Sequence, residues 1–153
     1  MCQATVAVMT DLISRRFDAL TVRELHDIAR LRSEVFVVEQ GCIYLDLDGC
    51  DTGPGAEHHW IEVDGSIASY ARTLTESGGE VRIGRVVTAP DVRGRGLAAI
   101  VMVALVELFG AAPLVLEAQS HLTEWYDRFG FVVAGEEYVE DGIPHVTMRR
   151  APG

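Results

Sequence analysis

The sequence predicts an α+β (mixed α/β) domain, in which a central, mostly antiparallel sheet is flanked by helices. Strand-like segments joined by short Gly-containing turns alternate with segments of helical periodicity, in the order strand, helix, three strands, helix, strand, helix and two strands. The length of 153 residues favours a single domain over residues 1–153, with no linker-like segment inside it. An apolar content of 48% excludes a disordered chain.

The N-terminal part predicts a strand, a helix and a long loop. Residues 13–17 favour a short strand. Thr21-Val-Arg-Glu24 has the form of a capping box, in which the Thr hydroxyl and the Glu carboxylate satisfy free amides at a helix start. Apolar residues then recur at helical spacing to about Val38. Residues 41–55 show no periodicity, and a loop of this length in a compact domain is often functional.

The middle of the chain predicts a β-hairpin, a third strand and a helix. Residues 58–63 and 66–74 flank the turn Asp64-Gly65, which is typical of a hairpin. A second turn leads into a strand over 80–88, which Pro90 ends. An apolar helix follows from about Gly94 to Phe109.

The C-terminal part predicts one more strand, a helix and a closing hairpin. Pro113 precedes a strand over 114–118, and a helix over 122–129 ends at Gly130, a residue favoured after helix C-termini. Residues 131–138 and 143–149 form the expected hairpin.

Charge and hydropathy exclude several partners. The 23 acidic and 13 basic residues give a net charge of −10, which disfavours nucleic acid and favours a cationic small molecule or peptide, or serves solubility alone.

The longest apolar run, residues 97–106, is too short to span a membrane. The chain start lacks the basic and apolar segments of a signal peptide. Cys2, Cys42 and Cys50 lack metal-type spacing and indicate reduced thiols, with a Cys42–Cys50 bridge as the alternative. We therefore expect a cytoplasmic protein.

A Gly-rich basic turn between a strand and a helix is the most informative segment. It reads Arg93-Gly-Arg-Gly-Leu-Ala-Ala99. Small residues let the backbone approach a ligand closely, and the unpaired amides and positive dipole end of the helix suit a pyrophosphate. Arg93 and Arg95 add positive charge. The alternative is an ordinary strand–helix turn with solvated arginines.

This turn resembles the (Gln/Arg)-x-x-Gly-x-(Gly/Ala) signature of the GNAT acetyltransferases. The resemblance implies that acetyl-CoA is the co-substrate and that its pyrophosphate is held by Arg93, Gly94, Arg95, Gly96, Leu97, Ala98 and Ala99. It also implies that the backbone of Val86, Val87 and Thr88 pairs with the pantetheine arm, with the amide of Val87 or Thr88 facing the oxyanion. Gln119 stands where many members carry an Asn that bonds the coenzyme.

A second match lies about thirty residues further on. Trp125-Tyr-Asp-Arg-Phe-Gly-Phe131 is similar to the family's aromatic-Tyr-x-x-x-Gly-Phe segment, which implies that Tyr126 protonates the departing thiolate. A phenol, with a reference pKa near 10, can serve a thiol with a pKa near 8.5 only when it is well placed. The alternative is an aromatic residue that only packs in the core.

Further blocks, spread over residues 21–149, resemble the ElaA-type branch of this superfamily. They are residues 32–40, the loop with Asp46, Asp48 and Asp51, His58, residues 83–86, His121, and residues 140–145. This branch informs the fold and the donor more than the acceptor.

The expected reaction is acetyl transfer from acetyl-CoA to a primary amine by direct attack, without a covalent enzyme intermediate. Glu39 is the first choice for the general base because it ends a helix beside an acidic loop. The acceptor, expected to be a cationic small molecule or peptide, is assigned to a set of five residues: Asp48, Asp51, His58, His121 and His145. Each of these has an alternative structural role, and Asp48 and the three histidines are also alternative bases.

Two other functions stay open. An acyl-homoserine-lactone synthase-like enzyme is suggested by Arg32, the acidic loop and Arg72, and a non-catalytic acyl-CoA-binding module would keep only the donor site. No spacing resembles a zinc motif, so no metal is expected. The acceptor's identity is open, and a homodimer is one state that the sequence allows.

Overall fold

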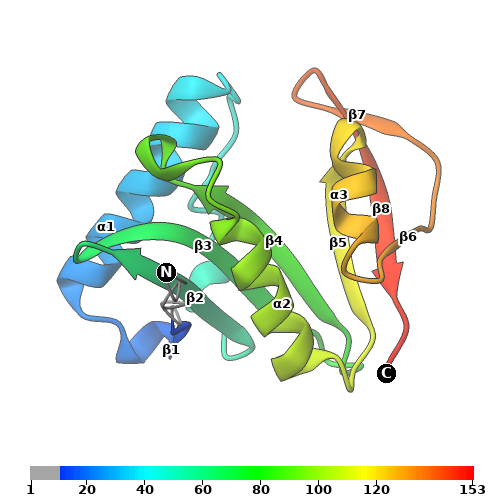
Figure 1. Cartoon of the computed structure of the whole chain (residues 1–153), viewed down its shortest axis with the longest axis horizontal. Helices are drawn as coiled ribbons and strands as arrows, with labels where there is room; N and C mark the ends of the chain where they lie inside the picture. The colour runs from blue at the N-terminus through cyan, green and yellow to red at the C-terminus, as the bar shows by residue number, and fades with distance from the viewer. Residues whose placement is uncertain (1–10) are drawn as a thin grey trace, which may run out of the picture.

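The computed structural model describes residues 11–153, so Cys2 and the chain start lie outside the described residues. Its centre is an eight-stranded sheet in the order β1-β2-β3-β4-β5-β8-β6, with β7 also paired to β8 (Figure 1). The strands are β1 (Ile13–Arg16), β2 (Ala56–Val63), β3 (Ser66–Thr75), β4 (Val81–Thr88), β5 (Leu114–Gln119), β6 (Val132–Val133), β7 (Tyr138–Glu140) and β8 (Ile143–Arg150). Only the pair β4–β5 is parallel among these strands.

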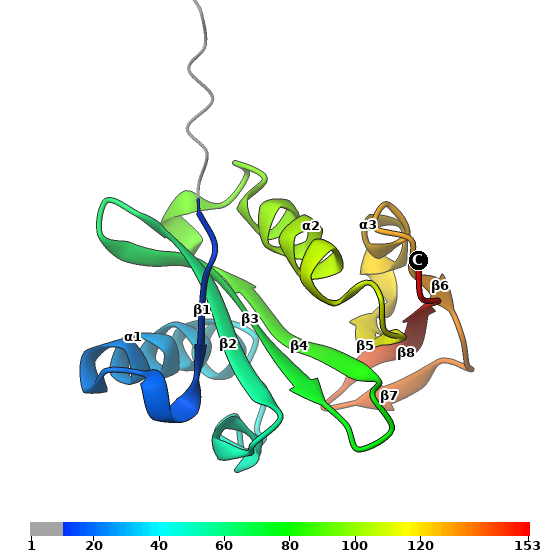
Figure 2. The same cartoon turned by 90° about the horizontal axis from the view of Figure 1, so that it is seen from below.

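Helices cover both faces of the sheet (Figure 2). Helix α1 (Val22–Arg32) lies on one face, whereas α2 (Leu97–Phe109) and the short α3 (Thr123–Asp127) lie on the other. The predicted capping box of α1 is confirmed, because the Glu24 amide donates to Thr21 Oγ1 at 3.0 Å and the Thr21 amide to Glu24 Oε2 at 2.9 Å. A π-helical segment, Ser33–Glu39, extends α1 toward the loop.

Each face has its own apolar cluster. Under α2 and α3, buried residues of β5 and β8 pack against Leu97, Val101 and Tyr126. Under α1, Ile28, Leu31 and Val35 pack against β2, β3 and β4. The apolar character of helix and strand is therefore used on both sides, and burial of these side chains stabilises the three-layer arrangement.

Most predicted boundaries shift by one or two residues, and three elements differ more. Helix α2 begins at Leu97 rather than Gly94, because Gly94 and Gly96 have φ of +79° and +74°, outside the helical region. The helix expected over 122–129 is regular only over Thr123–Asp127. The strand expected over 131–138 is split into β6 and β7, because exposed Gly135, Glu136 and Glu137 favour strand structure poorly.

Candidate active site

The sheet opens between its two parallel strands. Strands β4 and β5 pair only from Val81↔Leu114 to Ile83↔Leu116, and beyond this point they have no mutual register (Figure 1). The later residues Val86, Val87 and Thr88 of β4 and Gln119 of β5 therefore flank an opening in the sheet. In this opening, the backbone groups of β4 and β5 are not hydrogen-bonded to each other. An extended chain inserted here could therefore pair with them.

A β-bulge marks the start of this opening. Arg72 is paired with Gly84 and Tyr70 with Val87, so Arg85 and Val86 together oppose one residue of β3. Arg85 has φ of +54°, which is rare for a residue with a side chain. The bulge lets the Arg85 side chain reach the loop after α1 instead of entering the α2 core. No local pattern in the sequence predicts this distortion.

The Gly-rich turn leads into α2 beside the opening. Gly94 and Gly96 both have positive φ, and a Cβ at either position would meet no atom within 4 Å. Arg93 and Arg95 are exposed, and the first amides of α2 have no partner within the helix. The turn therefore combines space, free amides and positive charge, which fits a coenzyme pyrophosphate. Leu97 is buried, and Ala98 and Ala99 are half-buried.

Tyr126 lies on the same face of the sheet as this turn. Its side chain is 7% exposed, belongs to the cluster that contains Leu97, and packs edge-on against Trp125 at 4.9 Å between centroids. Val86 of β4 packs against this cluster as well. Burial raises the pKa of Tyr126 to about 12, so the phenol stays protonated near neutral pH.

The acidic loop is paired with arginines. The ion pairs are Arg32 with Asp46 (3.0 Å) and Asp51 (2.7 Å), Arg72 with Asp48 (2.8 Å) and Asp51 (3.1 Å), and Arg85 with Asp46 (2.9 Å) and Asp48 (3.2 Å). Burial opposes ionisation of Asp51, but hydrogen bonds from Arg32 and Arg72 outweigh it, and the pKa of Asp51 is lowered. The three carboxylates are thus neutralised by three guanidinium groups. Their charge is therefore compensated within the protein, and the role of Asp48 and Asp51 in binding the acceptor stays a prediction.

This arginine–aspartate cluster explains residues that the sequence analysis assigned otherwise. Arg32 and Arg72 suggested a second enzyme class, but in the structure they anchor the loop from within the protein, with 1% and 5% exposure. A signal was present, since Arg72 is the only charged residue of its strand, and a buried arginine requires a partner.

Glu39 is also paired. Its carboxylate lies 2.8 Å from Nη1 of Arg93, so the expected general base contacts a residue of the expected pyrophosphate site. Both side chains are 43% exposed.

The three histidines assigned to the acceptor have different environments. His58 is buried, with Nδ1 bonded to the Tyr70 hydroxyl at 2.7 Å and Nε2 to the Asp51 carbonyl at 3.0 Å, and burial lowers its pKa. His121 is exposed in the turn after β5. His145 is half-buried on β8 and is the register partner of Gln119.

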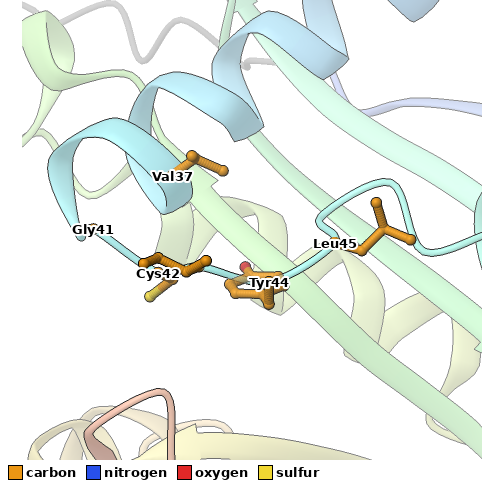
Figure 3. A pocket seen from close by; sticks show the side chains of 6 residues that line it. Val37, Gly41, Cys42, Tyr44 and Leu45 are labelled. Carbon is orange, nitrogen blue, oxygen red and sulfur yellow. The ribbon is translucent and has the colours of Figure 1, made fainter.

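An apolar groove of about 660 Å³ lies between the π-helical segment and the loop (Figure 3). Its lining consists of Val37, Gly41, Cys42, Ile43, Tyr44 and Leu45. Ile43 is 95% and Leu45 74% exposed. The guanidinium of Arg85 lies 5.1 Å from the centre of the Tyr44 ring, and the Gln40 amide contacts that of Gln119 at 3.5 Å, so the groove adjoins the opening of the sheet. Cys42 and Cys50 are free thiols.

Two possible features are absent from the described part of the chain. No helix in residues 11–153 has the length and apolar character needed to cross a bilayer. The His, Cys, Asp and Glu side chains of these residues form no group of three or more that could hold a metal ion.

Comparisons with known proteins agree with this geometry. Residues 50–151 match the family described as "Acetyltransferase (GNAT) domain". A UPF0039 protein of Mycobacterium tuberculosis is 44% identical over 138 residues, 88% of this chain and 88% of that protein. The crystal structure of Escherichia coli ElaA superposes with a TM-score of 0.86 and 34% identity, covering 93% of this chain and 99% of that one. A structure described as an acyl-CoA N-acyltransferase from Pseudomonas aeruginosa superposes with a TM-score of 0.85 and 41% identity. The match covers 93% of this chain and 99% of that one.

The predicted fold class and the resemblance to the ElaA-type branch are therefore confirmed. The split sheet, the glycine turn and the matches to relatives over most of their length lead to one assignment. The chain belongs to the GNAT acetyltransferase family.

Proposed function

We propose that the protein transfers an acetyl group from acetyl-CoA to a primary amine by direct attack of the amine on the thioester. The observation that carries this proposal is the opening between β4 and β5, with the Gly94–Gly96 turn and Tyr126 on the same side of it. Membership of the family supports acyl-CoA as donor. The choice of an acetyl group, of an amine and of the individual residues below belongs to the proposal.

The donor site uses the residues named from the sequence. The amides of Gly94 to Ala99 and the side chains of Arg93 and Arg95 would bind the pyrophosphate. The pantetheine arm would lie along Val86–Thr88, with the Gln119 amide at the facing strand. The Ala89 amide donates to Ala68 of β3 at 2.8 Å. Because successive amides of a strand point to opposite edges, the Thr88 amide is directed toward the opening and is the better oxyanion donor.

Tyr126 would protonate the sulfur as the carbon–sulfur bond breaks. A phenol with a pKa of about 12 gives its proton to a thiolate with a reference pKa near 8.5 at a cost of roughly 5 kcal/mol. The transfer becomes more favourable when the phenol regains a proton in the same step. The positively charged nitrogen of the adduct, which must lose a proton to become an amide, can supply it.

The acceptor is an amine with an apolar body in this proposal, rather than a polycation. The paired aspartates remove the main electrostatic reason for a polycationic acceptor. The groove beside the opening instead presents exposed Ile43 and Leu45, whose burial against a ligand is favourable. Glu140, near Tyr138, and Asp141, near Cys42, supply the remaining negative charge.

The test is a matched set of primary amines with acetyl-CoA as donor, with free coenzyme A and acetylated amine both quantified by chromatography. We expect both products in equal amounts, with a higher kcat/KM for 2-phenylethylamine than for spermidine. Coenzyme A release without an acetylated amine would mean thioester hydrolysis. Binding of acetyl-CoA without either product would instead support the non-catalytic binding module.

A further inference from the structure

The alternation of side chains along β5 and β8 places a histidine on the α1 face of the sheet, the side proposed to bind the acceptor. Leu116 and Ala118 of β5, with their register partners Met148 and Val146 of β8, lie in the cluster under α2 and α3. Because successive side chains of a strand point to opposite faces, the next pair, Gln119 and His145, lies on the α1 face. The contact between the amides of Gln119 and Gln40, which follows the π-helical segment, agrees with this placement.

Along the strand direction, His145 also lies level with the residues of β4 that are proposed to face the thioester. The last β4–β5 pair is Ile83↔Leu116, and the bulge on β4 adds one residue after Gly84. Continuing this register across the opening puts Val87 level with Gln119, the partner of His145. His145 therefore lies across β5 from the part of β4 proposed to face the thioester.

The ring of His145 is held with one nitrogen that has no hydrogen-bond partner among residues 11–153. Its Nδ1 lies 2.7 Å from the Ile143 carbonyl oxygen, which can only accept, so Nδ1 carries the hydrogen. In the neutral ring, Nε2 then has an available lone pair. The ring stacks on Tyr138 with centroids 5.9 Å apart and planes at 20°, and Tyr138 in turn donates to Glu117 at 2.6 Å.

The other sequence-based candidates for a base are engaged or exposed. Glu39 is paired with Arg93, and Asp48 with Arg72 and Arg85. Both ring nitrogens of His58 are hydrogen-bonded inside the protein. His121 lies exposed in the turn after β5. His145 alone among these five combines partial burial, a fixed ring and a free nitrogen.

We infer that Nε2 of His145 takes the proton from the protonated acceptor amine, directly or through one water, as the general base of the reaction. The inference rests on the proposed function. The neutral nitrogen then forms its bond to the carbonyl carbon, and the carbon–sulfur bond breaks. Tyr126 gives its proton to sulfur and regains the second proton of the nitrogen, while His145 releases the first to solvent. One proton is therefore released per acetyl group transferred.

The charged and titratable groups around this ring come from three elements. Glu117 on β5 accepts a hydrogen bond from Tyr138 and forms an ion pair with Arg82 of β4. Glu140 of β7 adds negative charge near the same tyrosine. These groups hold the Tyr138 ring on which His145 stacks.

The experiment compares His145→Asn and His145→Gln with the wild type, using acetyl-CoA and two amines. Asn keeps a donor for the Ile143 carbonyl but cannot take a proton. With 2-phenylethylamine, protonated at pH 7, we expect kcat/KM to fall about 100-fold or more in both variants. With 2,2,2-trifluoroethylamine, largely neutral at pH 7, the fall should be less than about tenfold, because no base is needed before attack. His26→Gln, at an exposed histidine of α1, is the matched control and should behave as the wild type.

Several readouts separate the outcomes. Acetyl-CoA affinity by calorimetry and the circular dichroism spectrum should be unchanged in the two His145 variants. Unchanged kcat/KM in both variants would overturn the role of His145 and leave the proposed function standing. Equal losses with both amines would also overturn it, since a base should matter only for the protonated amine. No transfer by the wild type to any amine would overturn the proposed function, and this inference with it.

Discussion

The guanidinium of Arg93 lies 2.8 Å from the carboxylate of Glu39, and this ion pair joins the glycine turn before α2 to the end of the π-helical segment after α1. The pair connects the proposed pyrophosphate site with the acceptor side of the opening. Because both side chains are 43% exposed, the ion pair is weak, and another anion can replace Glu39 as the partner of Arg93. A coenzyme pyrophosphate would compete with Glu39 for Arg93.

Replacing Glu39 by Gln should therefore strengthen donor binding. An exposed ion pair contributes up to about 1 kcal/mol, so the dissociation constant for acetyl-CoA should fall by no more than about fivefold. Calorimetry at low salt measures this change. Glu34→Gln, an exposed glutamate of the same segment, makes the same change in net charge and should have a smaller effect. A kcat lowered 100-fold or more in Glu39→Gln would instead support Glu39 as the base.

Replacing Gly96 by Glu should abolish measurable acetyl-CoA binding, because a carboxylate would occupy the place of the phosphates. The matched control is Gly65→Glu, in the turn between β2 and β3. Both glycines have positive φ, +74° and +77°, and both have open space at the Cβ position. The two variants should therefore lose similar stability, about 1–3 kcal/mol each, while only Gly96→Glu loses the donor. Wild-type affinity in folded Gly96→Glu protein would contradict the proposed donor site.

Replacing Tyr126 by Phe should leave donor binding nearly intact and lower kcat by about 10²- to 10⁴-fold, the usual contribution of one general acid. Steady-state rates across pH, together with calorimetry of acetyl-CoA binding, measure the two effects separately. Trp125→Phe changes a neighbouring aromatic residue without removing the phenol, and its kcat should fall far less. Equal kcat in Tyr126→Phe and the wild type would make Tyr126 a packing residue of the core.

Replacing Ile43 by Asp should reduce selectivity for apolar amines. If the groove binds the body of the acceptor, loss of a contact with this 95% exposed side chain should lower kcat/KM for 2-phenylethylamine about tenfold and affect methylamine little. Val22→Asp, at an 88% exposed apolar residue of α1, is the control for added charge. The same ratio of rates for the two amines in all three proteins would show that the groove does not bind the acceptor.

Stability should decrease as the pH falls from about 6.5 to 4 because of His59. This side chain is fully buried between Ser14 and Thr73, and burial lowers its pKa to about 4. The unfolded chain binds a proton near pH 6.5 that the folded chain does not, so the free energy of unfolding falls by roughly 3 kcal/mol across this range.

Urea unfolding of the wild type and His59→Gln at several pH values isolates this contribution, since His58 acts in the same direction in both proteins. The difference in stability between the two should narrow as the pH falls. His26→Gln, at an exposed histidine, should follow the wild type. A constant difference between His59→Gln and the wild type would show that His59 does not titrate in this range.

The features that depend on neighbours in the chain could be predicted from the sequence. The capping box at Thr21 and Glu24 needs residues three apart, and the strand–turn–helix segment that contains Arg93 to Ala99 is continuous in the chain. Periodicity and turn residues therefore determined the order of the elements and the expected donor site. The family resemblance of these same segments added the residue Tyr126.

The tertiary structure decided which side chains meet. Arg32 and Asp51, which form an ion pair, are 19 residues apart in the sequence, and Gln40 and Gln119, which are in contact, are 79 apart. Local periodicity gives no information about contacts at such separations. The loop aspartates therefore looked free in the sequence and are paired in the fold. The bulge at Arg85 was likewise not visible in the sequence. Its one extra residue sends the following side chains of β4 to the opposite face of the sheet. Only the register of β4, β5 and β8 could place His145 beside Gln119 on the α1 face.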